Sequence, residues 1–178
     1  HGFNILCIEQ AALGERAETL LRRRSDHPCF DAAMHHLALG KTLLGTRVSD
    51  VLAGVRFLKN EYNASEIGII GNSLGGTVAI YSSALSNDIT YGIFSCCFSS
   101  FAESIFATYH CADLYLPDLA THFSAGDIVG LSAPKPIVLA TGLTDPIFPI
   151  RGFRDELAQV ERIYSCAKAS ENLRKVIG

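Results

Sequence analysis

The chain alternates short apolar runs with longer stretches of helical periodicity, and this alternation restricts its fold more than any other feature. Runs rich in β-branched residues predict buried strands over residues 4–9, 66–71, 91–98, 136–141 and 173–177. Apolar residues recur at helical spacing over residues 32–44, 48–59, 74–85 and 152–166. Because helices connect successive strands, the strands are expected to run parallel, with helices on both faces of the sheet. The sequence therefore predicts an α/β fold.

The length and composition favour a single compact domain. The chain has 178 residues, of which 48% are hydrophobic, so it can bury a sizeable core. It contains no internal repeat, low-complexity tract or long linker. We therefore expect one domain over residues 1–178.

The charge pattern argues against several classes of partner. A formal net charge of −3 provides no basic surface for nucleic acid or an anionic membrane. The cationic run from Arg22 to Arg24 is followed by Asp26, which favours a solvated turn or helix end over a phosphate site. No apolar run approaches the roughly 20 residues of a membrane-spanning helix. The first residues lack a signal-peptide pattern, and since they do not begin with methionine, we expect a longer parent chain.

The six cysteines show no motif of their own. They form no CxxC pair and no Cys/His cluster with zinc spacing, so no metal is predicted. Cys7, Cys96 and Cys97 lie inside apolar runs, which predicts buried free thiols. A reducing, cytoplasmic setting follows as the default, while a secreted protein with unusual disulfides stays open.

The segment from Gly71 to Gly76 reads GNSLGG and fits the pattern G-x-S-x-G between a predicted strand and a predicted helix. In such a corner the flanking glycines avoid side-chain clashes across a tight turn, and Ser73 is raised above the sheet. The free N–H groups at the start of the helix favour negative charge there. Ser73 is therefore a candidate nucleophile, and the N–H of Leu74 a candidate donor to an oxyanion.

A structural interpretation of the same segment stays open. Glycine-rich turns between strand and helix also hold phosphate, and a serine there can cap the helix. However, the spacing is not G-x-G-x-x-G, no Gly-Lys-Ser follows, and this strand is not the first of its unit. These departures favour the nucleophile.

A nucleophilic serine needs a base and an acid that orients the base. Asp145 follows the predicted strand 136–141, and the carboxyl ends of parallel strands share the edge on which active sites form. Asp-Pro is also a common turn, so a turn-forming aspartate is the alternative. Asp113, Asp118 and Asp127 are rival acids.

No histidine follows Asp145 in the sequence. Those that precede it are His1, His27, His35, His36, His110 and His122. His35 and His36 lie in a helical pattern and favour surface or packing roles. His110 and His122 lie near the two ends of residues 109–123, which we expect to form a short lid or pocket wall. Structural roles are favoured for both histidines.

Several stretches together resemble the dienelactone-hydrolase-like branch of the α/β-hydrolase superfamily, near bacterial carboxylesterases and acetyl-xylan-esterase-like proteins. They are GFNILCIEQAALGER, LALGKTLLGTRVSDVLAGVRFL, IGIIGNSLGGTVAIYSSAL, YHCADLYLPDL and DIVGLSAPKPIVLATGLTDPIFPI. The resemblance implies an α/β-hydrolase fold that lacks its N-terminal strands and its C-terminal histidine loop here. It implies a triad of Ser73, Asp145 and a histidine beyond Gly178, with the second oxyanion donor upstream of His1.

The resemblance also implies the reaction, which is cleavage of a small carboxylic ester, such as an acetyl ester, through an acyl-serine intermediate without metal or cofactor. The expected partner is a small-molecule ester, with Tyr115, Leu116, Ile147 and Phe148 as candidates for an apolar wall. A peptidase of the prolyl-oligopeptidase type and a non-enzymatic relative with the same fold are the alternatives. The oligomeric state is not readable, and a homo-oligomer stays open.

Overall fold

The computed structural model describes residues 2–17 and 28–178, which divide into two compact units. One unit comprises His1–Ala64 with Cys111–Tyr115, and the other comprises Ser65–His110 with Leu116–Gly178. Outside the described residues lie the cationic run Arg22 to Arg24 with Asp26, and the histidines His1 and His27. The single domain expected over residues 1–178 stays a prediction.

The second unit contains a parallel four-stranded sheet. Its strands are β1 (Gly68–Asn72), β2 (Tyr91–Ser95), β3 (Ile137–Thr141) and β4 (Leu173–Ile177), paired in that order. Gly68 pairs with Tyr91, Gly92 with Ile137, and Ile137 with Leu173. The predicted α/β class and parallel sheet are confirmed. The bounds predicted for β4 are correct, whereas those of the other three strands differ by one to three residues at an end.

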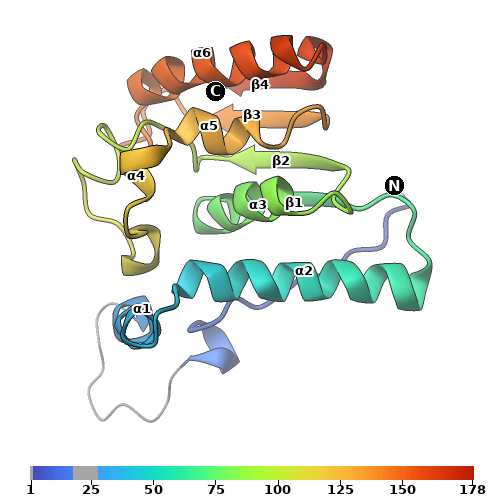
Figure 1. Ribbon diagram of the computed structural model, residues 1–178, viewed down its shortest axis with the longest axis vertical. Helices are drawn as coiled ribbons and strands as arrows, with labels where there is room; N and C mark the ends of the chain where they lie inside the picture. The colour runs from blue at the N-terminus through green and yellow to red at the C-terminus, as the bar shows by residue number, and fades with distance from the viewer. Residues whose placement is uncertain (1, 18–27) are drawn as a thin grey trace. The chain divides into compact units, whose positions relative to one another are not determined.

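Three helices pack against the core of this sheet, namely α3 (Leu74–Leu85), α5 (Ala125–Gly130) and α6 (Ile150–Cys166). The short helix α4 (Leu119–His122) contributes the partly buried Leu119. Figure 1 shows α3, α5 and α6 side by side in front of the strands. The core includes Phe94 and Leu139 from the sheet with Phe153 and Tyr164 from α6, all fully buried. The bounds predicted for α3 are correct, α6 begins two residues earlier than predicted, and α4 and α5 were not predicted.

Two of the four strands are less buried than the sequence predicts. The side chain of Ile70 in β1 is 75% exposed, and four of the five residues of β4 are exposed. Both strands stand at the ends of the sheet order, where side chains of another strand flank them on one side only. The prediction that β1 and β4 are buried strands is therefore wrong, although their pairing is as expected.

The first unit is built on two helices, α1 (Pro28–Ala38) and α2 (Leu43–Tyr62), with the short helices η1 (Gly14–Arg16) and η2 (Ala112–Leu114). The helix predicted over residues 32–44 is wrong in its C-terminal half. Gly40 adopts φ +68, and the Thr42 side chain accepts a hydrogen bond from the N–H of Gly45 at 3.1 Å. The left-handed glycine ends one helix and the threonine cap begins the next.

The strand predicted over residues 4–9 is also wrong, because residues 2–10 form no regular secondary structure. A strand needs the hydrogen bonds of a neighbouring strand. Here the side chains of Leu6 and Ile8 lie instead against α2 at Gly54, where an added Cβ would come within 2.7 Å of Ile8 Cδ1. The apolar residues of this run therefore serve helix packing rather than sheet pairing.

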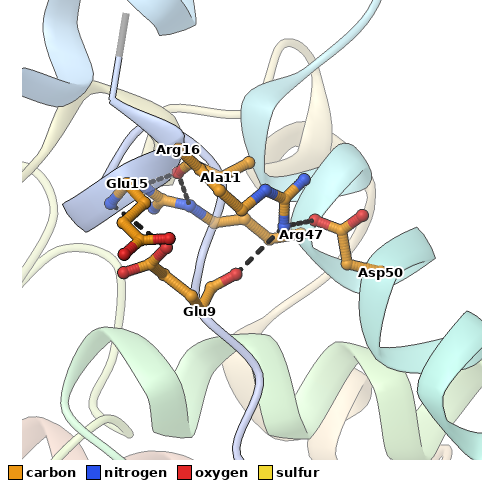
Figure 2. A network of polar contacts seen from close by, with 6 residues as sticks. All are labelled: Glu9, Ala11, Glu15, Arg16, Arg47 and Asp50. Atoms are coloured by element: carbon orange, nitrogen blue, oxygen red, sulfur yellow. Dashed lines mark hydrogen bonds and ion pairs between the residues drawn. The ribbon is translucent and has the colours of Figure 1, made fainter.

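Two arginines hold the segment that follows onto α2. Arg16 Nη1 donates to the carbonyl of Glu9 at 3.0 Å and to Asp50 Oδ2 at 2.6 Å (Figure 2). The buried Arg47 donates through Nε and Nη2 to the carbonyl of Ala11, at 3.1 and 2.9 Å. These bonds provide partners for backbone carbonyls that lie outside any strand or helix.

The cysteines fit the expected buried thiols only in part. Cys29 and Cys97 are buried, whereas Cys7, predicted to be buried, is exposed. Burial raises the pKa of the Cys97 thiol. Cys7 is exposed because the run that contains it is not a strand of the sheet. Among the helices of the described ranges, none is both long and apolar enough to cross a membrane.

Candidate active site

Ser73 occupies a sharp corner between β1 and α3. Its backbone has φ 52 and ψ −123, a conformation that costs a residue other than glycine about 1–3 kcal/mol. The corner is held on both sides, since the N–H of Ser73 donates to the carbonyl of Ser95 at 2.8 Å and its carbonyl accepts from the N–H of Thr77 at 3.0 Å. The strain is therefore maintained by the end of β2 and by the first turn of α3.

The glycines around Ser73 differ in what they contribute. A Cβ on Gly71 would lie 2.1 Å from the carbonyl oxygen of Gly75, so only glycine fits there. A Cβ on Gly76 would lie 2.5 Å from Cys97 Sγ. A Cβ on Gly75 would meet nothing within 4 Å. The expectation that the second glycine of G-x-S-x-G avoids a clash is therefore wrong, and Gly76 has that role.

The Ser73 side chain is exposed and does not cap the helix. Ser73 is the N-cap residue of α3, yet its hydroxyl makes no capping hydrogen bond. The structural interpretation as a helix cap thus lacks the bond that would define it. Leu74 is the first residue of α3, where N–H groups have no carbonyl one turn earlier to bind. The corner accordingly presents a hydroxyl beside helix N–H groups, a combination suited to developing negative charge.

Asp145 lies in the loop that follows β3. Its Oδ1 accepts hydrogen bonds from the N–H groups of Ile147 and Phe148, both at 2.9 Å. These bonds form a local turn that fixes the carboxylate. Because β1 and β3 are parallel and separated only by β2, Ser73 and Asp145 both follow carboxyl ends at the same edge of the sheet.

A buried hydrogen-bond network supports the Asp145 loop. The Ser104 hydroxyl donates to the carbonyl of Ile147 at 2.6 Å, and Ser104 Oγ lies 3.0 Å from His110 Nε2. Because the single hydroxyl proton is engaged with Ile147, Nε2 is the donor to Ser104. The His110 ring also packs edge-on against Phe148, with centroids 5.3 Å apart. The sequence offered no signal for Ser104, which lies in an irregular segment.

His110 has the structural role that the sequence favoured. Its side chain is 5% exposed, and burial lowers its pKa, so the ring is neutral near pH 7. His122 ends α4 and packs against Phe123, with ring centroids 6.4 Å apart. His36, on α1 of the first unit, places Nδ1 2.7 Å from the carbonyl of Ala32. His35 lies on the same helix.

The rival acids have other positions. Asp127 belongs to the capping box of α5 with Ser124, and Gln159 Nε2 donates to its Oδ1 at 2.5 Å. Hydrogen bonds from the Ser124 backbone and the Gln159 side chain lower the Asp127 pKa. Asp118 is the N-cap residue of α4, and Asp113, in the first unit, pairs with Arg47. Of the four aspartates, Asp145 alone lies in the loop after β3.

The carboxyl end of β4 is bonded to the loop that leads to Asp145. The N–H of Gly178 donates to the carbonyl of Thr141 at 3.1 Å, and the N–H of Leu143 donates to the carbonyl of Gly178 at 2.8 Å. A residue that directly follows β4 would therefore lie beside the Asp145 loop.

The segment expected to form a lid, residues 109–123, is divided between the two units, with Cys111–Tyr115 in the first. Its position as a lid stays a prediction. Of the candidates for an apolar wall, Ile147 is 43% exposed beside Asp145, whereas Phe148 is buried against His110. Leu116 lies in the second unit and Tyr115 in the first.

Known proteins resemble this chain over part of their length. No protein-family model matches it. It is 26% identical over 182 residues to "Putative hydrolase YtaP" of Bacillus subtilis (strain 168), which covers 98% of this chain but only 58% of that protein.

Solved structures resemble the chain over its fold. A "putative acetyl xylan esterase" from Bacteroides fragilis superposes with a TM-score of 0.74 at 20% identity, covering 96% of this chain and 45% of that one. A carbohydrate esterase family 15 glucuronoyl esterase from Caldicellulosiruptor kristjansonii gives 0.65 at 12% identity, covering 77% and 45%. The expected resemblance to carboxylesterases is thus confirmed at the level of structure. The chain therefore has the α/β-hydrolase fold, because it superposes on these structures and has a parallel sheet with a serine corner.

Proposed function

We propose that the protein is a serine hydrolase that cleaves a carboxylic ester, with Ser73 as nucleophile. The observation that carries this proposal is the strained, exposed Ser73 at the corner between β1 and α3, whose hydroxyl makes no capping bond. Strain of this kind persists where the surrounding structure enforces it, and it is common at active sites. Similarity to a protein named as a putative hydrolase and to structures named as esterases supports the same reaction class.

The reaction would proceed by acyl transfer. Ser73 Oγ attacks the ester carbonyl carbon while a base accepts the hydroxyl proton, and the Leu74 N–H stabilises the tetrahedral oxyanion. The tetrahedral intermediate then breaks down to the acyl-serine, and the alcohol leaves with the proton that the base had accepted. Water, deprotonated by the same base, then attacks the acyl carbon. The bond to Ser73 Oγ breaks, the base returns the proton to Oγ, and the carboxylic acid is released. One such oxyanion donor is typically worth about 3 kcal/mol of the barrier.

Asp145 would orient the base. We place that base, a histidine, in residues that would follow β4. The hydrogen bonds between Gly178 and the residues Thr141 and Leu143 support this position, because they join the end of β4 to the Asp145 loop. An acid in this position fixes the tautomer of the histidine and stabilises its charged form.

A small acyl group, such as acetyl, is the substrate class that we propose. Its support is the similarity in fold to the putative acetyl xylan esterase from Bacteroides fragilis. We also propose a reducing, cytoplasmic setting, with which the free thiols of Cys29 and Cys97 are compatible.

A fluorophosphonate probe tests the nucleophile directly. The full-length protein, which would carry the proposed base after β4, should be labelled at Ser73 and should hydrolyse p-nitrophenyl acetate. The Ser73→Ala variant of the same protein should lose both properties. Ser165→Ala is the matched control, because Ser165 is an exposed serine on α6. Equal labelling of wild type and Ser73→Ala, or no labelling of wild type, would remove Ser73 as nucleophile.

A further inference from the structure

A cluster of potential metal ligands lies in the first unit, away from any sequence motif. Cys29 lies on α1, Cys111 directly precedes η2, and Asp113 lies in η2. The two sulfur atoms and a carboxylate oxygen all lie within 4.8 Å of one another. The sequence predicted no metal site, because Cys29 is far in the chain from Cys111 and Asp113 and the cysteines have no zinc-ligand spacing. The fold brings them together.

The Asp113 carboxylate has one oxygen in use and one without a partner. Its Oδ2 accepts from Arg47 Nη1 at 2.5 Å, and neither side chain is exposed to solvent. Its Oδ1 is buried and has no hydrogen-bond partner. A buried acceptor that lacks a partner is unfavourable, and such groups in native structures often indicate an absent ion or water. This oxygen is therefore available to a ligand in the cluster.

Arg47 organises the same cluster from α2. Arg47 donates to the carbonyl of Ala11 (Figure 2). It also donates to Asp113, and its Nη2 lies 3.2 Å from Cys29 Sγ. Hydrogen bonds of this kind orient ligand atoms and stabilise a thiolate. Two thiolates and one carboxylate carry three negative charges. The Arg47 guanidinium and one divalent cation would balance them.

We propose that Cys29 Sγ, Cys111 Sγ and Asp113 Oδ1 bind a divalent metal ion of the zinc class, with Arg47 holding two of the three ligands. Zinc prefers thiolate, imidazole and carboxylate ligands in a tetrahedron. Sulfur atoms bound to one zinc ion lie about 3.8 Å apart, as follows from Zn–S bonds of about 2.3 Å. Ligand atoms already within 4.8 Å of one another need to move little.

Binding exchanges protons for the metal and leaves one position open. The ion forms two metal–sulfur bonds and one metal–oxygen bond, and the two thiol protons pass to solvent. With three protein ligands, a zinc ion would take a water molecule in its fourth position. The site would tie Cys111–Tyr115 to the helix that carries Cys29.

A disulfide between Cys29 and Cys111 is the competing interpretation. It would use both sulfur atoms but would leave Asp113 Oδ1 buried without a partner. A carboxylate oxygen of Asp113 lies within 4.8 Å of both sulfur atoms, and the unpartnered oxygen of this carboxylate favours the cation over the disulfide.

Cobalt titration of the purified protein, first treated with chelator and reductant, tests the site. One equivalent of Co²⁺ should give a thiolate-to-cobalt charge-transfer band that Zn²⁺ displaces. Cys29→Ser and Cys111→Ser should lose this band, and Cys166→Ser should keep it, since Cys166 is exposed at the end of α6. No band in the wild type, or the same band in Cys111→Ser, would overturn the proposal.

A second measurement keeps the test independent of how the variants fold. In the wild-type protein, Zn²⁺ should slow alkylation of Cys111 and leave the alkylation rate of Cys166 unchanged. Equal alkylation rates for Cys111 with and without Zn²⁺ would contradict the site. A Cys29–Cys111 disulfide found by mass spectrometry in metal-free, reductant-treated protein would also contradict it.

Discussion

Individual residues around Ser73 and Asp145 are placed by backbone contacts rather than by side-chain packing. Gly71 is required because the carbonyl of Gly75 lies where its Cβ would be, and Ser73 is required to adopt φ 52 because Ser95 and Thr77 bond its backbone. The Asp145 carboxylate is oriented by two backbone N–H groups of its own loop. Substitutions of the Ser73 and Asp145 side chains can therefore change the reacting groups while the backbone contacts that position them are kept.

Asp145→Asn tests the acid without disturbing the loop. The asparagine oxygen can still accept from Ile147 and Phe148, so the turn should persist while the negative charge is lost. If Asp145 orients a histidine, kcat should fall by about 10⁴-fold, with unchanged circular dichroism. Asp155→Asn, at an exposed position on α6, should keep full activity. An active Asp145→Asn enzyme would assign the acid to another residue.

At the scale of the elements, the C-terminal end of α3 is stabilised by a side chain from outside the helix. Lys135, which precedes β3, donates from Nζ to the carbonyl of Ser83 and to that of Ser86 at 2.7 Å. These carbonyls belong to the C-terminal end of α3, where a cation is favourable. Burial lowers the pKa of Lys135. This contact fixes the far end of the helix whose first turn holds Ser73.

Lys135→Met should destabilise the protein by about 2 kcal/mol, because two charge-assisted hydrogen bonds to helix carbonyls are lost. Urea unfolding measures this loss. Lys175→Met is the control, since Lys175 makes an exposed ion pair with Glu161 at 2.5 Å that should contribute less than about 1 kcal/mol. Equal losses in the two variants would show that Lys135 does not support α3.

The sequence predicted the elements that follow a strict period and missed those set by distant contacts. Residues 74–85 form the predicted helix because an apolar stripe and a glycine corner are both local signals. Residues 4–9 have the composition of a strand but pack on α2, and no local signal shows which partner a β-branched run will find. For the same reason Ser73 and Asp145 could be proposed from sequence, whereas Ser104 and the cluster of Cys29, Cys111 and Asp113 could not.

At the scale of the whole molecule, stability should depend on pH through His110. Its folded pKa is below the ordinary value of 6.5, so the unfolded chain binds more protons as the pH falls through that value. The stabilisation is complete above about pH 6.5 and is lost as the pH falls towards the folded pKa.

His110→Gln provides the comparison for this pH dependence. The glutamine amide can still donate to Ser104 but does not titrate over this range. The thermal midpoint of the wild type should therefore fall more than that of His110→Gln between about pH 7 and about pH 5. Parallel midpoint curves for the two proteins would contradict a buried neutral His110.

Because Cys111–Tyr115 belong to the first unit, two fragments produced by cleavage between Ala64 and Ser65 should not dissociate readily. Cleavage at a protease site inserted between Ala64 and Ser65 would give two fragments, and the larger one would retain Asp113, the buried partner of Arg47 on the smaller. Breaking that pair would leave an uncompensated buried charge. The nicked protein should therefore elute from a sizing column as one species and separate only in denaturant.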